Sequence, residues 1–154
     1  MNRLAFIAIL IFAGCILHAQ TTTKKTTTPA HPAAAGPTKV TGDGVKTASG
    51  LQYWDIKVGT GQEAKSHDHV KVHYTGWLTS GKKFDSSVGG KPFDFWVDGG
   101  DVIKGWDEGV KGMKVGGKRQ LRIPPDLAYG REGYPGAIPP NATLIFDIQL
   151  VAIQ

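Results

Sequence analysis

The sequence of 154 residues has a single cysteine, Cys15, and no apolar run of the roughly 20 residues that a membrane-spanning helix needs. One cysteine excludes an internal disulfide, and no second thiol is present for a cysteine-based zinc site. A marked charge excess is missing as well. The net charge is +5, but residues 43–154 hold 14 basic and 13 acidic residues, so the excess lies near the N-terminus. Because nucleic-acid binding depends on clustered positive charge, we expect no nucleic acid as a partner.

The first 19 residues have the pattern of a secretory signal peptide. Arg3 precedes a short apolar run over residues 4–17, and this arrangement is typical of export signals. Two processing sites fit the sequence: cleavage before Gln20, or lipidation of Cys15, which ends a stretch similar to a bacterial lipobox. The pattern predicts an exported protein, periplasmic or secreted, or alternatively a lipoprotein that reaches the membrane only through Cys15.

Residues 20–46 are rich in Thr, Pro, Ala, Gly and Lys and contain almost no large apolar side chain. Such a segment cannot bury enough surface to offset the entropy lost on ordering, so we expect a disordered linker. Residues 47–154 then form one domain, which is large enough to build a core without a disulfide or a structural metal.

Alternation of apolar and polar residues predicts most of the domain's strands. It is clearest in residues 70–75, 120–123 and 144–150, and residues 51–58 and 93–97 are further candidates. A period of two with one apolar face is typical of half-buried antiparallel strands.

One short amphipathic helix is predicted between these strands. Its apolar residues Ile103, Trp106, Val110 and Met113 recur at spacings of three, four and three. Glycines inside this segment keep the helix short, because each disfavours a helix interior by about 1 kcal/mol relative to alanine. The expected fold class is α+β, with a curved antiparallel sheet around one helix. Residues 124–141 follow as a stiff loop rich in proline and tyrosine, a candidate lid for the open end of the sheet.

Six linked motifs resemble the FKBP family of peptidyl-prolyl cis/trans isomerases in their order and spacing. They occupy residues 72–76, 81–87, 102–110, 128–130, 138–140 and 142–147. The resemblance extends over residues 51–153 and implies a half-barrel of five or six antiparallel strands wrapped on a short helix. It further implies a bacterial exported member of the family, which accelerates X-Pro rotation during the folding of exported proteins.

The resemblance implies a prolyl pocket of apolar and aromatic side chains. Six residues would line the ring or flank the twisting bond as catalytic residues: Tyr74, Phe84, Asp85, Trp106, Tyr129 and Phe146. Five more would contact the substrate: Phe93, Val102, Ile103, Tyr134 and Ile138. Among them, Trp106 would form the floor, and the Ile103 backbone N–H and the Tyr129 hydroxyl would hold peptide carbonyl oxygens.

The implied reaction needs no cofactor and no metal. Rotation about an X-Pro bond makes and breaks no covalent bond, although its uncatalysed barrier is about 18–20 kcal/mol. The implied partners are proline-containing polypeptides and macrolides of the tacrolimus type, bound by a monomer. Three departures from the family pattern bear on substrate and macrolide preference: Tyr134 in place of a histidine, the small Ala137, and a shortened loop at residues 87–91.

Other interpretations stay open at this point. Aromatic residues at periodic positions are usually core, and Asp85 alone is typical of a turn. His67, His69 and His73 share one strand parity, which permits a metal site, although a solvated strand face is the default interpretation. The same fold also suits a chaperone module that holds its partners without turnover, or a tethered surface adhesin.

Overall fold

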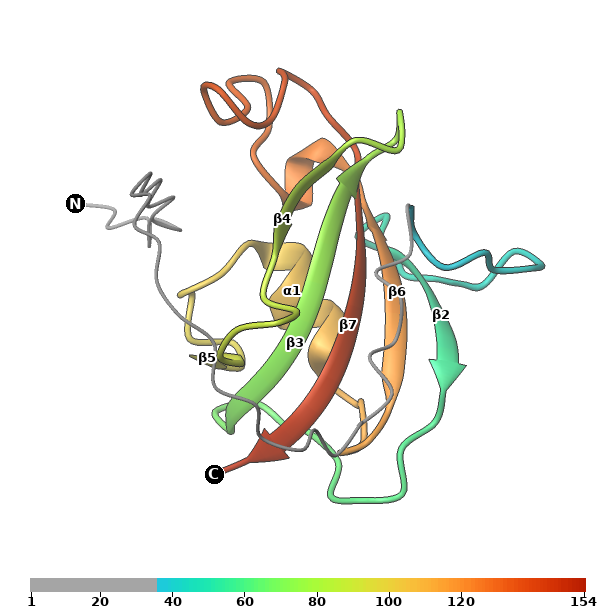
Figure 1. The fold of residues 1–154 in the computed structure, drawn as a ribbon, viewed down its shortest axis with the longest axis vertical. Helices are drawn as coiled ribbons and strands as arrows, with labels where there is room; N and C mark the ends of the chain where they lie inside the picture. The colour runs from blue at the N-terminus through green and yellow to red at the C-terminus, as the bar shows by residue number, and fades with distance from the viewer. Residues whose placement is uncertain (1–35) are drawn as a thin grey trace, which may run out of the picture.

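The structure, a computed structural model, describes residues 36–154; the predicted signal peptide and most of the predicted linker lie outside these residues. Within this range the chain forms one antiparallel sheet and one α-helix (Figure 1). The elements are β1 (Val45–Lys46), β2 (Gln52–Lys57), β3 (His69–Leu78), β4 (Lys83–Ser86), β5 (Phe93–Trp96), α1 (Lys104–Val110), β6 (Lys118–Ile123), the 3₁₀ turn η1 (Pro125–Leu127) and β7 (Leu144–Ile153). None of the helical segments in this range has the length and apolar character needed to cross a membrane.

The strands follow the order β1-β2-β6-β7-β3-β4, and β5 pairs with the other end of β3. The two longest strands, β3 and β7, form the centre and pair from Val70↔Ile153 to Leu78↔Leu144. Figure 1 shows the sheet curving around α1. The predicted α+β half-barrel around one short helix is therefore confirmed, with seven strands once the two-residue β1 is counted.

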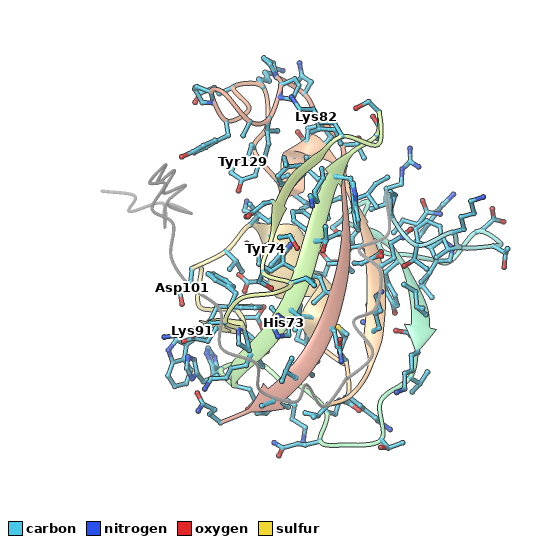
Figure 2. All side chains as sticks on the ribbon, in the orientation of Figure 1. His73, Tyr74, Lys82, Lys91, Asp101 and Tyr129 are labelled. Carbon is cyan, nitrogen blue, oxygen red and sulfur yellow. The ribbon has the colours of Figure 1, made fainter. Side chains whose placement is uncertain are left out.

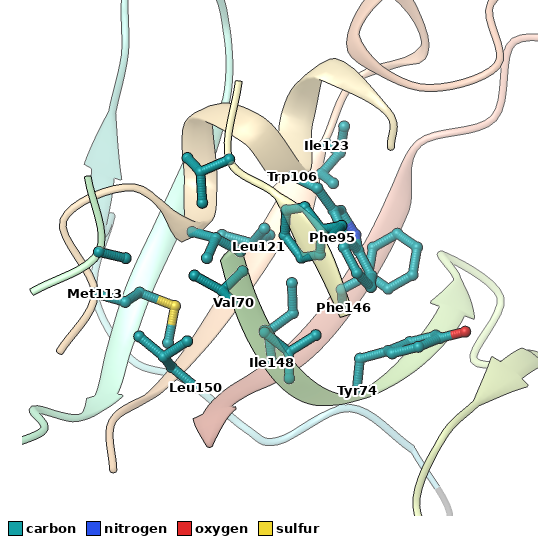
Figure 3. Close-up of a cluster of buried hydrophobic side chains, with 14 of the residues drawn as sticks. Val70, Tyr74, Phe95, Trp106, Met113, Leu121, Ile123, Phe146, Ile148 and Leu150 are labelled. Carbon is teal, nitrogen blue, oxygen red and sulfur yellow. The ribbon is translucent and has the colours of Figure 1, made fainter. Parts of the chain in front are cut away.

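Side chains alternate between the two faces of the sheet as the sequence predicts. On β3 and β7 the inward residues are buried, and with β5, β6 and α1 they form one apolar core (Figure 3). Its largest fully buried side chains are Phe95, Leu51, Leu121, Ile123, Leu144, Ile148 and Leu150.

Two glycines bring α1 directly onto β6. A Cβ atom on Gly105 would lie 2.4 Å from the Ile123 side chain, and one on Gly109 would lie 2.5 Å from the Leu121 side chain. These glycines are therefore needed for close packing of helix on sheet, in addition to limiting helix length. This close approach sets the distance between α1 and β6, and with it the position of the Trp106 side chain relative to the sheet.

The end of the predicted linker is part of the domain. Val45 and Lys46 form β1 and pair with β2 through Val45↔Tyr53 and Lys46↔Gln52. Thr38 is hydrogen-bonded to Asp147 of β7. Ordered contacts thus begin before the expected boundary at residue 47. The segment has little apolar surface to bury, and hydrogen bonds to the sheet stabilise it instead. For residues 20–35 the disordered linker stays a prediction.

Candidate active site

The Trp106 indole lies among four aromatic rings. Its ring centroid is 4.8 Å from that of Tyr74 and 5.3 Å from that of Phe146, at interplanar angles of 76° and 88°. The centroids of Phe93 and Phe95 lie at 5.9 and 5.7 Å, at 81° and 53°. Three of the four contacts are edge-to-face, which is a preferred geometry for aromatic pairs. The Trp106 ring orientation is therefore fixed from several sides by strands β3, β5 and β7.

Gly76 creates the space for a second aromatic pair beside Trp106. A Cβ atom there would lie 2.6 Å from Phe146 Cε1 and 2.7 Å from Phe84 Cζ. With no Cβ in the way, the Phe84 and Phe146 rings meet perpendicularly at 5.5 Å between centroids. The glycine that ends the 72–76 motif is thus a packing requirement of the site.

The indole nitrogen of Trp106 is buried without a hydrogen-bond partner. Across residues 36–154 it is the one buried side-chain nitrogen or oxygen for which no acceptor or donor is found. Aromatic ring faces accept N–H groups only weakly, so the surrounding rings replace little of the lost hydration. The indole nitrogen of Trp106 therefore lies in a mainly apolar environment.

A single polar pair lies at the edge of this aromatic cluster. The Tyr74 hydroxyl donates to Asp85 Oδ2 at 2.6 Å, and Asp85 Oδ1 accepts the Ser86 backbone N–H at 2.8 Å. Burial, and then the Asp85 carboxylate, raise the pKa of Tyr74 well above the ordinary tyrosine value. Tyr74 consequently stays a neutral donor, and it holds the carboxylate in a fixed orientation.

Two further donors at the cluster have no partner among the described residues. Ile103 precedes α1 in an extended conformation, and its carbonyl accepts the Trp106 backbone N–H at 2.9 Å while its own N–H has no acceptor. The Tyr129 hydroxyl is also unpaired there, and burial, then Asp85 and Tyr134, raise the pKa of Tyr129. Figure 2 shows the two labelled tyrosines, Tyr74 from β3 and Tyr129 from the loop after β6. The site therefore offers two free hydrogen-bond donors beside an apolar surface.

The loop from 124 to 141 is closed by its own backbone hydrogen bonds. The Asn141 N–H donates to the Gly130 carbonyl at 2.9 Å, and Tyr134 and Ile138 exchange two bonds of 2.8 Å. The Tyr129 and Tyr134 rings meet at 6.0 Å between centroids. The loop therefore presents both tyrosines on a scaffold that its own hydrogen bonds hold together.

All eleven predicted site residues lie in or beside the apolar core that contains Trp106. The ten apolar or aromatic ones belong to the core cluster or pack against it, and Asp85 joins them through Tyr74. Four are buried: Tyr74, Trp106, Ile138 and Phe146. Seven are half-buried: Phe84, Asp85, Phe93, Val102, Ile103, Tyr129 and Tyr134. Solvent therefore reaches part of seven of these side chains, whereas the other four lie inside the core.

Two residues of the site were not predicted. Phe95 contacts Trp106 from β5 and is 2 % exposed, and Gly76 opens the space for Phe84. The signal for Phe95 was present in the sequence, because Phe93 and Phe95 share strand parity and must face the same side. No local pattern distinguishes Gly76 from an ordinary turn glycine.

The three histidines do not form a common site. His67 lies before β3 with a positive φ of 68°, His69 contacts Asp94 at 3.1 Å, and His73 contacts the Ser87 hydroxyl at 3.2 Å. Within the described part of the chain, no three His, Cys, Asp or Glu side chains are arranged to hold a metal ion. The structure thus gives the metal interpretation no support.

Comparison with known proteins gives consistent matches. The family described as FKBP-type peptidyl-prolyl cis-trans isomerase matches residues 60–151. The chain is 58 % identical over 114 residues to FK506-binding protein 4 of Dictyostelium discoideum, which covers 74 % of the chain and 31 % of that protein. It is 49 % identical over 124 residues to the 39 kDa FK506-binding nuclear protein of Drosophila melanogaster, covering 80 % and 33 %. The solved structure of AtFKBP13 is 45 % identical, with a TM-score of 0.66 over 71 % of this chain and 97 % of that one.

These matches correct the predicted localisation. Both curated relatives come from eukaryotes, and the Drosophila protein is named a nuclear protein. The expectation of a periplasmic or secreted protein, or of a lipoprotein anchored through Cys15, is therefore wrong, and the matches give no support to a bacterial exported member. The signal-like pattern misled because charge and hydropathy over a short apolar run define it only loosely. The chain spans about a third of the length of these relatives.

Proposed function

The chain belongs to the FKBP-type peptidyl-prolyl cis-trans isomerase family, and we propose that it accelerates the rotation of X-Pro bonds at the aromatic cluster around Trp106. The observation that carries this proposal is the buried indole, fixed by perpendicular rings and bordered by unpaired donors. This arrangement combines an apolar surface for a proline ring with hydrogen bonds for the flanking peptide.

An apolar surface of this kind favours the twisted amide over the planar one. A planar amide has a large charge separation that water stabilises, and twisting about the C–N bond breaks the resonance that produces it. When the proline ring lies against aromatic side chains, the planar ground state loses hydration while the twisted state loses less. The difference lowers the barrier, because only interactions stronger in the transition state accelerate the reaction.

In this proposal Trp106 supports the face of the proline ring, and Tyr74, Phe93 and Phe146 surround it. Phe84 and Asp85 flank the rotating bond, where the hydrogen bond from Tyr74 orients the carboxylate. Val102 and Ile138 extend the apolar contact to neighbouring substrate residues. Their packing against one core makes the surface rigid, which favours a single bound geometry.

The two free donors orient the substrate. The Ile103 N–H and the Tyr129 hydroxyl bind carbonyl oxygens on either side of the prolyl ring, so the chain on one side of the bond is held while the other turns. Because neither donor has a partner among the described residues, substrate binding requires no internal hydrogen bond to break.

The proposed ligands are proline-containing polypeptides and macrolides of the FK506 type, which is tacrolimus. Support for the second class comes from the names of the relatives, which are FK506-binding proteins. Tyr134 and Ala137 are half-buried and lie in the loop after β6, so these departures from the family pattern act on ligand preference rather than on rotation itself. We propose that the chain acts as a monomer, which size-exclusion chromatography with light scattering tests.

A proline-limited peptide assay with the full chain tests the proposal. We expect the rate of cis-to-trans conversion of a tetrapeptide with an apolar residue before proline to rise in proportion to protein concentration, and FK506 to abolish the effect. A chaperone module without turnover gives a different result: peptide binding by calorimetry without any change in the conversion rate. That outcome would reject isomerisation and leave binding.

A further inference from the structure

On the face of the sheet opposite Trp106, a polar cluster binds one residue from the segment before β1. We propose that this outer face has an intramolecular binding site that recognises a threonine or serine in an extended segment, and that Thr38 is its natural occupant. We call it the threonine site; Lys118 and Gln120 of β6 and Asp147 of β7 form it.

The register of the central strands places the site. Gln120 and Asp147 are direct partners across β6 and β7, so their side chains lie on one face. Asp147 follows Phe146, and Gln120 precedes Leu121, whose side chains point into the core; alternation therefore puts the polar pair on the other face. Gln120 and Asp147 are only 5 % and 6 % exposed. Polar groups buried to this degree need partners, and the segment before β1 provides them.

Three separate groups of Thr38 are bound. Its backbone N–H and its hydroxyl both donate to Asp147 Oδ2, at 3.0 and 2.6 Å. Its carbonyl accepts Gln120 Nε2 at 2.7 Å, and the same nitrogen donates to Asp147 Oδ1 at 2.8 Å. Lys118 Nζ lies 3.5 Å from the hydroxyl and 3.8 Å from Asp147 Oδ2. The amide of Gln120 uses both of its protons, and both oxygens of Asp147 are occupied.

This pattern selects a hydroxyl residue. A backbone N–H and C=O would be offered by almost any residue, but only a serine or threonine adds a short bond from the side chain to the buried carboxylate. Hydrogen bonds to charged groups are stronger than neutral ones, so the hydroxyl dominates the selectivity. A valine has the shape of threonine and would leave one oxygen of Asp147 without its shortest partner.

The site fixes where the preceding chain is attached. Thr38 is attached to the outer face of the sheet, whereas the aromatic cluster lies on the inner face. Loss of the threonine site should therefore release residues 36–44 from the outer face without changing catalysis.

Amide hydrogen exchange of the full chain, followed by mass spectrometry, tests the proposal. In Thr38→Val, we expect exchange of the peptide covering residues 36–44 to accelerate by about 10- to 100-fold, the range for losing one hydrogen bond to a charged group. Exchange in β3 and β7 peptides should stay as in the parent, which shows that the domain remains folded. The value of kcat/KM should also be unchanged.

Two variants of the same segment complete the test. Thr38→Ser keeps the hydroxyl and should restore protection to within about threefold of the parent, since the bond to Asp147 is retained. Thr41→Val, at an exposed threonine with no hydrogen bond among the described residues, should leave exchange unchanged. Equal protection in Thr38→Val and in the parent would overturn the proposal, as would equal deprotection in Thr38→Ser and Thr38→Val.

Discussion

The two faces of β7 differ at adjacent residues. Phe146 points inward and meets Trp106 and Phe84 through perpendicular rings, whereas Asp147 points outward and binds Thr38 and Gln120 through hydrogen bonds. The inner face leaves a buried indole nitrogen unpaired, and the outer face pairs both oxygens of a buried carboxylate. One strand thus supports a site built on ring shape and a site built on hydrogen bonds.

The difference shows how each face depends on its neighbours. Ring packing on the inner face draws on β3, β5, β7 and α1 at once, so a change in one ring alters the orientation of several others. Hydrogen bonds on the outer face involve a few defined atoms, so a change there removes specific partners and leaves the rings in place. We expect inner-face variants to change activity and stability together, and outer-face variants to change stability alone.

The largest effect is expected from Trp106→Ala. Removing a buried indole that contacts four rings should lower the free energy of unfolding by about 3–5 kcal/mol. We expect kcat/KM in the proline-limited peptide assay to fall by roughly 10- to 100-fold, because the proline ring loses its supporting surface. Denaturant unfolding and the peptide assay measure the two effects.

A matched control for this variant is Trp96→Ala. Trp96 is 52 % exposed on β5 and contacts none of the predicted catalytic residues, so kcat/KM should stay as in the parent. Trp106→Phe, which keeps a ring, should retain more of the fold and part of the activity. If Trp106→Phe folds and Trp106→Ala has full activity, Trp106 is core only.

Gly76→Ala tests the inner face from the opposite direction, by adding an atom. The new Cβ would lie 2.6 Å from Phe146 and 2.7 Å from Phe84, and neither rigid ring can move without disturbing the other. Overpacking of this kind costs about 1–3 kcal/mol, and we expect a value toward the upper end together with a several-fold lower kcat/KM.

The control for this change is Gly90→Ala. A Cβ atom there would have its nearest neighbour at an ordinary 3.6 Å, and its backbone does not have a positive φ. The free energy of unfolding of Gly90→Ala, measured by thermal unfolding, should lie within about 0.5 kcal/mol of the parent value, as is usual for surface substitutions. Equal stability of the two alanine variants would contradict the packing role of Gly76.

Sequence patterns predicted the inner face well and the outer face hardly at all. Strand parity placed Tyr74 and Phe146 inward, and helical spacing placed Trp106 on the apolar face of its helix, because burial imposes a local period on the chain. Only the family resemblance implied that these three rings meet. Thr38 and Asp147 are 109 residues apart, and their hydrogen bond leaves no periodic trace. The linker prediction missed Thr38 because it was based on the low content of apolar residues. Composition gives no information on distant hydrogen-bond partners.

The glycines of α1 also show that local sequence patterns do not predict contacts between distant elements. Helix propensity explains why Gly105 and Gly109 shorten α1, yet their approach to Ile123 and Leu121 depends on where β6 lies in space. Phe95 is a different case. Its shared strand parity with Phe93 can be recognised in the sequence, but the family resemblance names only Phe93 as a site residue.

Gln120→Leu tests the outer face at its buried amide. The leucine fills a similar volume but leaves Asp147 Oδ1 and the Thr38 carbonyl without their donor. An unsatisfied buried acceptor costs about 1–3 kcal/mol, and we expect about 1–2 kcal/mol because Asp147 keeps Thr38 and Lys118. The decisive readout is kcat/KM, which should match the parent. A drop comparable to that of Gly76→Ala would show that the two faces are not independent.

The smallest effect concerns the Tyr74–Asp85 pair of the inner face and appears only at high pH. Burial, and then Asp85, raise the pKa of Tyr74 above the unfolded value of about 10. Below pH 10 both states keep the phenolic proton, and the stabilising difference is complete. Above pH 10 the unfolded chain loses the proton while the folded chain keeps it, so stability falls as pH rises, by at most about 1.4 kcal/mol per pH unit for this group.

Tyr74→Phe removes this titration, so its free energy of unfolding should fall less steeply with pH than that of the parent between pH 10 and 11. Denaturant unfolding at half-unit pH steps measures the two slopes. Both proteins keep Tyr129, whose pKa is also raised, so the difference between the two slopes reports on Tyr74. Parallel slopes would mean that Tyr74 ionises in the folded chain as it does in the unfolded chain. The inner face would then be more accessible to water than the packing of its aromatic rings implies. The two faces of the sheet would no longer differ in the way described.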